Sequence, residues 1–182
     1  MDNDDFDIIA DLKQENKRDL AFRILVKKYQ EKLYWHIRKI VINHDDADDV
    51  LQNTFLKIWR NIDNFREESS LYTWLYRIAT NESISFLNSN KRRSYIPINE
   101  TNDYLVKNIE SGTYFEGDEA QKKLQKAILK LPEKQRIVFN MKYFDEMKYE
   151  DMSQILDTSV GALKASYFHA VRKIEEYLKN TD

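Results

Sequence analysis

Residues 160–173 combine cations, hydrogen-bonding side chains and small side chains at the spacing of one helix. Lys164, Arg172 and Lys173 can bind phosphates, and Ser166 and His169 can reach base edges. Small residues at the helix start let the backbone approach a groove closely. The pattern favours duplex DNA binding over a helix-turn-helix that only packs against protein. The residues left for DNA are Gly161, Ala162, Lys164, Ala165, Ser166, His169, Arg172 and Lys173.

A second set of polar and aromatic residues lies between positions 64 and 91. At helical spacing a broad polar face forms opposite the apolar side, and nearby rings add aromatic surface. Cations that follow phosphates and rings that stack on unpaired bases suit single-stranded DNA. The alternative is a place in the core, which we favour for Trp74 and leave open for Tyr72 and Tyr76. The set contains Phe65, Tyr72, Thr73, Tyr76, Arg77, Thr80, Asn81, Asn88 and Lys91.

A third pattern places Leu56 among polar residues on one side of a helix. Asp49, Gln52, Asn53 and Leu56 follow the i, i+3, i+4, i+7 spacing, which puts them on a common face. Such a face is either solvated, with one stray leucine, or a patch where a partner helix docks. Periodicity alone leaves both interpretations open.

The residue types give little indication of catalysis or of metal or cofactor binding. The chain has no cysteine, and its three histidines show no metal-binding spacing. The acids around Asp45 and Asp49 lack the alternation and glycine of a calcium loop, and they suit a helix N-terminus instead. No nucleophile elbow, P-loop or dinucleotide fingerprint is present. We therefore expect neither an enzyme nor a cofactor or metal.

Helices are expected to position all of these residues. With only three glycines and two prolines, the chain has little turn chemistry for a β-rich fold. The 3.6-residue period predicts helices over residues 19–42, 46–62 and 71–90. In the C-terminal part, Pro132 opens a helix that buries Ile137, Val138, Met141 and Phe144. A helix-turn-helix follows, with residues 149–156, a turn at Asp157 and an N-cap at Ser159 before a helix to Leu178.

Charge is distributed unevenly, although the net charge is only −2. Residues 1–19 carry seven acids against three bases, residues 94–119 six acids against Lys107, and residues 120–182 twelve bases against nine acids. The pattern predicts an all-α protein with two small helical domains, 1–93 and 120–182, joined by a flexible acidic linker over 94–119. The acidic N-terminus excludes a signal peptide, no apolar run is long enough to enter a membrane, and a cytoplasmic location fits.

The same residues resemble a known family. The run from Ala47 to Gln52, followed by Phe55, Leu56 and Trp59, resembles region two of bacterial sigma factors, and the match continues from Phe65 to Asn81. Residues 131–136 and the Val160-Gly161 pair with Lys164 resemble region four. With no third domain between them, the chain is similar to the extracytoplasmic-function (ECF) subfamily.

The resemblance implies partners and site residues. Core RNA polymerase, through its β′ clamp helices and β subunit, and promoter DNA are the implied partners, with an anti-sigma factor holding the protein inactive. The residues that it implies for polymerase binding are Asp49, Gln52, Asn53 and Leu56. Those that it implies for binding and melting the minus-ten element are Phe65, Arg66, Ser69, Tyr72, Thr73, Tyr76, Arg77, Asn81, Lys91 and Arg92. Those that it implies for binding the minus-thirty-five element are the eight residues of 161–173 named above.

Two other functions are compatible with parts of the sequence. A free-standing helix-turn-helix regulator would bind duplex DNA tightly without polymerase, and its N-terminal helices would dimerise or sense a signal. A helical enzyme lacks a catalytic constellation. Family members also often have Glu at the position of Asn53, and Arg where Ser166 and His169 stand, so the minus-thirty-five contacts here are expected to be weaker in charge or different in sequence.

Overall fold

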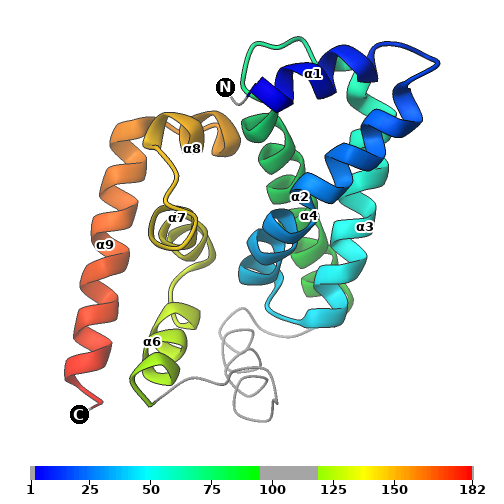
Figure 1. Ribbon diagram of the computed structural model, residues 1–182. Coiled ribbons are helices and arrows are strands. Elements are labelled where there is room, and N and C mark those ends of the chain that lie inside the picture. Colours follow the sequence, from blue (N-terminus) through cyan, green and yellow to red (C-terminus); the bar gives the residue numbers. More distant parts are fainter. Residues whose placement is uncertain (1–2, 95–118, 182) are drawn as a thin grey trace. The chain divides into compact units, whose positions relative to one another are not determined.

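The computed structural model describes residues 3–94 and 119–181, which form helices joined by short connections, without a β-strand among them (Figure 1). This confirms the all-α prediction. The helices divide into two compact units, described separately below. The acidic linker expected over 94–119 falls outside the described residues, except for the single residue at each of its ends.

The N-terminal helices bury the apolar positions that their periodicity predicts. Leu25, Leu33 and Ile37 of α2 are fully buried, as are Ile58 of α3 and Leu75 of α4. Apolar residues three and four positions apart make one continuous side of each helix, so burying that side fixes which side faces solvent. The elements are α1 Asn3–Leu12, α2 Arg18–Val41, α3 His44–Asn61, the short 3-10 helix η1 Ile62–Asn64 and α4 Leu71–Ser94.

Polar contacts connect α4 to the two helices before it. The buried His36 Nε2 of α2 lies 2.9 Å from Thr80 Oγ1 of α4. Lys57 Nζ of α3 lies 2.5 Å from Glu82 Oε1 of α4. A hydrogen bond between buried side chains is costly to leave unmade, so the first contact selects the register of α4 against α2.

Helix α1 was not expected from the sequence, which shows an acidic segment there. It packs against α2 and buries Ile8, Ile9 and Leu12. Asp5 is only 5% exposed, and both of its carboxylate oxygens accept from the Tyr29 hydroxyl at 2.8 Å. Lys28 Nζ lies 3.0 Å from the same carboxylate. One of the seven acids of this segment therefore anchors α1 to α2.

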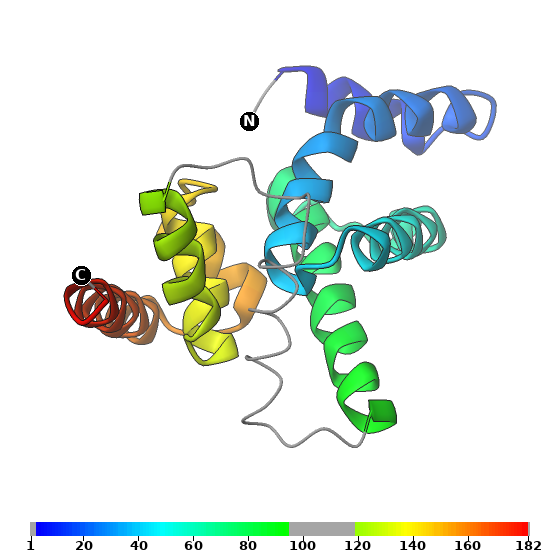
Figure 2. The same ribbon diagram turned by 90° about the horizontal axis from the view of Figure 1, so that it is seen from below.

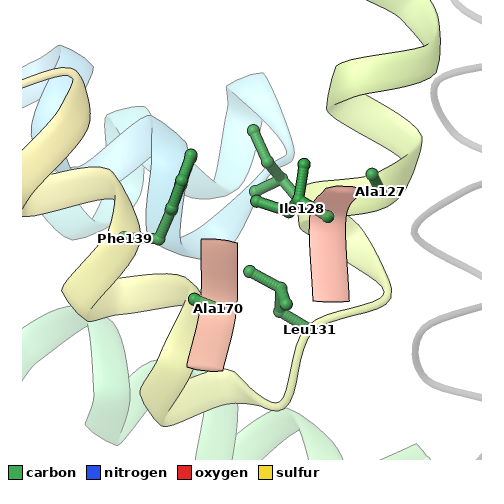
Figure 3. Packing of buried hydrophobic residues seen from close by; sticks show 6 residues of the cluster. Ala127, Ile128, Leu131, Phe139 and Ala170 are labelled. Carbon is green, nitrogen blue, oxygen red and sulfur yellow. The ribbon is translucent and has the colours of Figure 1, made fainter. Parts of the chain in front are cut away.

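The C-terminal part has a separate apolar cluster (Figure 3). Its helices are α6 Glu119–Leu129, α7 Glu133–Tyr143, α8 Tyr149–Leu156 and α9 Val160–Lys179. Viewed almost along α9, helices α6 and α7 lie on one side of α9 (Figure 2). The cluster consists of Ala127, Ile128, Leu131, Phe139, Ala170 and Ile174.

One expectation for this core was wrong. Ile137, Val138 and Met141 are buried as predicted, but Phe144 is 37% exposed and Phe139 is buried instead. Helix α7 ends at Tyr143, so Phe144 follows the helix rather than continuing its buried side. Phe139 instead stacks against the Tyr167 ring of α9, with centroids 5.8 Å apart.

The helix-turn-helix has the predicted turn chemistry. Asp157 adopts the left-handed conformation, with φ 49° and ψ 48°, directly after α8. Ser159 then caps α9 by accepting a hydrogen bond from the Ala162 amide at 3.3 Å. A left-handed residue ends one helix and a side-chain oxygen satisfies the first amides of the next, so three residues suffice for the turn.

We expect Tyr29→Phe to weaken the docking of α1, because the buried Asp5 carboxylate loses its hydroxyl donor. Leaving a buried acceptor without its donor costs about 1–3 kcal/mol. All three tryptophans, Trp35, Trp59 and Trp74, lie in the N-terminal helices, so urea unfolding followed by tryptophan fluorescence reports on this part alone.

Tyr34→Phe is the matched control, since it removes a hydroxyl from the same helix. Its partner is the exposed His44 ring, whose Nδ1 lies 2.6 Å from the tyrosine oxygen. Water can replace that contact, so the unfolding midpoint should move little. Equal losses in both variants would contradict the anchoring role of Asp5.

Candidate nucleic-acid and partner interfaces

Helix α3 presents the predicted polar face to solvent. Asn43 caps it by accepting from the Asp46 amide at 3.2 Å. Ala47, Val50, Thr54 and Ile58 are buried on the opposite side. Asp49, Gln52, Asn53 and Leu56 are exposed, and we call these four residues the docking face.

Leu56 is the apolar centre of the docking face, with 46% of its surface exposed. An exposed leucine with polar neighbours at i−4, i−3 and i−7 offers a helical partner both apolar contact and hydrogen bonds. The acids at the start of α3 crowd together: burial raises the pKa of Asp46, and the charges of Asp49 and Asp45 raise it further. Several carboxyl groups therefore lie close together at the start of the helix, an arrangement that suits a basic partner.

The connection from α3 to α4, which we call the 62–70 loop, exposes charged residues over a buried ring. Phe65 is 5% exposed, and its ring centroid lies 5.1 Å from that of Trp74. Arg66 is exposed, and Glu67 after it has a φ of 60°. Ser70 ends the loop by accepting from the Thr73 amide at 3.1 Å, as an N-cap of α4 does.

Helix α4 exposes a narrower polar stripe than the sequence predicted. Arg77, Asn81 and Asn88 are exposed, one or two helical turns apart. Tyr72 is half-buried, with its ring 4.2 Å from that of Tyr76. This stripe therefore offers a cation for phosphates, amides for base edges and a partly exposed ring for stacking, which are the groups that bind an unpaired strand. Ser69 is half-buried at the end of the loop.

Three residues of this set are buried: Phe65, Thr73 and Tyr76 are 5%, 2% and 4% exposed. The prediction that Phe65 and Thr73 form exposed surface is wrong, and Tyr76, for which surface and core were both left open, lies in the core. Thr80, also placed on the polar face, is fully buried because its hydroxyl donates to the Tyr76 carbonyl at 2.7 Å. Hydroxyl groups that bond within the helix or to His36 can be buried without penalty, so α4 buries more than one stripe. Lys91 and Arg92 lie outside the residues whose side chains are described.

Helix α9 presents its cations on the side away from the core. Leu163, Ala170 and Ile174 are buried, whereas Lys164, His169, Arg172 and Lys173 are exposed, as are Gly161, Ala162 and Ala165. Ser166 is half-buried. Nothing lies within 4 Å of where a Cβ would stand on Gly161, so the start of α9 is open to a groove. The geometry suits a helix that enters the major groove of duplex DNA.

Tyr149, the first residue of α8, lies between two of the cations. Lys142 Nζ lies 5.0 Å and Lys164 Nζ 5.7 Å from its ring centroid. Burial raises the pKa of the Tyr149 hydroxyl, with a further contribution from Tyr167. The ring attracts both ammonium groups, which keeps Lys142 of α7 and Lys164 of α9 close to the start of α8.

Sequence reasoning missed Phe168 on this face. Its side chain is 57% exposed, with its ring centroid 5.9 Å from the Arg172 guanidinium and 5.8 Å from the His169 ring. Helical spacing would have identified it, since it stands four residues after Lys164 and four before Arg172. An exposed ring on such a helix is suited to contact the methyl group of thymine.

No group of side chains suited to hold a metal ion occurs in the described part of the chain. Within the same residues, no helix combines the length and apolar character needed to cross a membrane.

The two parts of the chain match two family models. Residues 25–93 match sigma-70 region 2, and residues 121–174 match sigma-70 region 4.

Similar proteins include the ECF RNA polymerase sigma-E factor of Haemophilus influenzae, which is 31% identical over 94% of both chains. The RNA polymerase sigma-H factor of Pseudomonas aeruginosa is 32% identical over 96% of this chain and 94% of its own. Among solved structures, CnrH in complex with the cytosolic domain of CnrY has a TM-score of 0.71 at 23% identity, covering 99% of this chain and all of that one. The sigma factor RpoE in complex with the anti-sigma factor NepR, from Bartonella quintana, has a TM-score of 0.66 at 23% identity, covering 87% of this chain and 96% of that one.

We expect Ser159→Ala to loosen the first turn of α9, because the Ala162 amide loses its acceptor. Loss of an N-cap serine costs about 1 kcal/mol. Amide hydrogen exchange of Ala162 and Leu163 should accelerate. Ser166→Ala makes the same change inside α9, where alanine is the better helix former, and should leave this exchange unchanged or slower. Unchanged exchange in Ser159→Ala would show that the cap does not hold the turn.

Proposed function

The chain belongs to the ECF sigma factors of bacterial RNA polymerase, and we propose which of its surfaces perform the tasks of such a factor. A sigma factor of this subfamily binds core RNA polymerase and directs promoter-specific initiation of transcription. It is not itself an enzyme, since the polymerase carries out the chemistry.

The proposed domain boundaries are 1–93 for a region-two domain, 94–119 for a linker and 120–182 for a region-four domain. The matches to the two region models, which end at residue 93 and begin at residue 121, support this division. The helical units on either side each have a core of their own, which supports separate folding.

The docking face of α3 is proposed to bind the clamp-helix coiled coil of the β′ subunit. The observation that carries this is the exposed Leu56 surrounded by Asp49, Gln52 and Asn53. A coiled coil offers a ridge of helix surface, and a helix with one apolar side chain and flanking acceptors is complementary to it.

The 62–70 loop and the exposed stripe of α4 are proposed to melt the minus-ten element and to hold a flipped base. Arg66, Ser69, Tyr72, Arg77 and Asn81 are the accessible candidates. Flipping a base costs a few kcal/mol of stacking free energy, which contacts between the base and the protein have to offset. We assign Phe65, Thr73 and Tyr76 the supporting role of holding these residues from beneath. Lys91 and Arg92 are carried over on sequence similarity alone.

Helix α9 is proposed to read the minus-thirty-five element in the major groove. Lys164, Arg172 and Lys173 are placed for phosphates, and Ser166, His169 and Phe168 for base edges. The open first turn at Gly161, Ala162 and Ala165 allows close approach. With a net charge of −2, the free protein should bind DNA weakly and gain specificity in the complex with polymerase.

Location and regulation follow from the family. A sigma factor acts on RNA polymerase in the cell interior, so we place this protein in the cytoplasm. Two solved structures with the same fold are complexes, one with the cytosolic domain of CnrY and one with the anti-sigma factor NepR. We therefore propose an anti-sigma factor that covers the docking face or a DNA face.

We expect Leu56→Arg to weaken binding to core polymerase by roughly tenfold or more, because a central apolar contact is replaced by an unmatched charge. Titration of labelled protein with purified core enzyme measures this. The control is Trp35→Arg, which introduces the same charge at a side chain of α2 that is 53% exposed. Trp35 lies near the first residue of α3 and not near Leu56, because its neighbour Tyr34 contacts His44. If Leu56→Arg binds like the wild type, the docking face is wrongly assigned.

We expect Asn81→Ala to impair promoter opening more than duplex binding. Loss of one hydrogen bond to an unpaired base should lower the fraction of open complex about fivefold. Transcript starts mapped on fragmented genomic DNA, transcribed by core enzyme with this chain, identify a promoter to use. Permanganate reactivity then measures opening, and a mobility shift at low temperature measures duplex binding. Equal losses in both assays would refute the melting role of this residue.

A further inference from the structure

Two charged side chains near the N-terminus contact the 62–70 loop. Lys13, in the connection between α1 and α2, pairs with Glu67. Arg18, the first residue of α2, pairs with Asp63 at 3.1 Å. Both cations precede the region-two match, which begins at residue 25. The loop is therefore contacted by an N-terminal segment that the family model does not include.

Arg18 is the stronger of the two connections. Its Nη1 donates to Asp63 at 3.2 Å and its Nη2 to the Trp59 carbonyl at 3.2 Å. Its guanidinium carbon also lies 4.8 Å from the centre of the Trp59 ring. The Arg18 side chain is only 26% exposed whereas Asp63 is 64% exposed, so water screens the contacts with Trp59 less than it screens the ion pair. A planar guanidinium with several partners holds the end of α3 in one orientation.

The segment that carries Lys13 is itself anchored. Helix α1 is held on α2 by Ile8, Ile9 and Leu12 and by the buried contact between Asp5 and Tyr29. The turn that follows is closed by a hydrogen bond from the Gln14 amide to the Asp11 carbonyl at 3.1 Å. A cation on a fixed turn loses less conformational entropy when it pairs than one on a mobile end.

Lys13 meets the loop at its most unusual residue. Glu67 has a φ of 60°, a left-handed conformation that is unfavourable for a residue with a side chain. Its neighbours Arg66 and Glu68 are exposed and not packed into the core. A contact at this residue therefore favours one conformation of a segment that its own packing leaves free to adopt others.

We infer that α1, the following turn and the first residue of α2 form a clasp that holds the 62–70 loop ready to receive an unpaired promoter base, with Lys13 and Arg18 as positioning residues. This inference rests on the proposed melting role of the loop. Neither cation needs to touch DNA: each contributes by reducing the number of loop conformations before the base arrives. The N-terminal segment thus takes part in promoter opening.

The experiment compares open-complex formation by full-length variants with core polymerase on the mapped promoter. Lys13→Glu replaces attraction to Glu67 by repulsion, and an exposed pair of this kind is worth about two- to fivefold in an equilibrium. We expect an opening defect of that size, with polymerase binding and urea unfolding unchanged. Adding Glu67→Lys should restore the ion pair with the charges exchanged. The double variant should therefore form more open complex than is predicted by multiplying the effects of the two single variants.

Lys32→Glu is the matched control. Lys32 is exposed on α2, outside α1 and the turn that follows it. The change alters the net charge equally and leaves the loop contact and the turn intact, so opening should match the wild type. Equal defects in Lys13→Glu and Lys32→Glu, or independent effects of positions 13 and 67, would overturn the clasp. A wild-type protein that opens no promoter would instead overturn the proposed function, and with it the role of the clasp.

Discussion

The burial of one side of α3 against α2 determines what the N-terminal part of the molecule shows to its surroundings. Val50 and Ile58 are pressed into the core, so residues about half a helical turn away must face solvent. Asp49 and Leu56 are exposed for this reason rather than by local preference. The same packing fixes where α3 ends, and therefore where the 62–70 loop begins. The surfaces proposed for polymerase docking and for base capture thus share one structural cause, although they consist of different residues.

The C-terminal part obeys the same constraint with a separate core. Phe139 and Leu131 belong to the cluster that buries Ala170 of α9, and burying this side of α9 leaves its cations on the other. The left-handed Asp157 and the cap at Ser159 determine where the helix starts, and therefore which residues reach a groove first. Reading duplex DNA and melting it are assigned to surfaces with independent cores.

Much of this organisation could be predicted because it depends on periodicity. The long helices, the exposed Leu56, the turn at Asp157 and the cap at Ser159 follow from spacing and turn chemistry. Family membership removes the two alternatives of a free-standing regulator and a helical enzyme. Helix α1 was not predicted, because its packing depends on contacts of Asp5 with a tyrosine and a lysine far along the chain, which the sequence of this segment does not reveal.

The misassigned rings and hydroxyls have a related physical cause. The hydroxyl groups of Thr73 and Thr80 make their hydrogen bonds inside the protein, and the Tyr76 ring lies 4.8 Å from the ring of the buried His36. Their spacing is that of a surface face, and only tertiary contacts with α2 and the loop reveal the burial. Phe65 is buried because it packs against Trp74 across the end of the loop. Contacts between distant residues, such as those of Lys13 and Arg18, leave no periodic signal at all.

Three faces of the chain are proposed to have three different partners in the initiation complex. Site-specific photocrosslinking from positions 56, 81 and 165 identifies each partner, since all three side chains are exposed. We expect crosslinks from position 56 to a polymerase subunit, from position 81 to unpaired bases of the minus-ten element, and from position 165 to duplex DNA upstream. Crosslinks from position 81 to paired DNA or to protein alone, or from position 56 to DNA, would refute this division of roles.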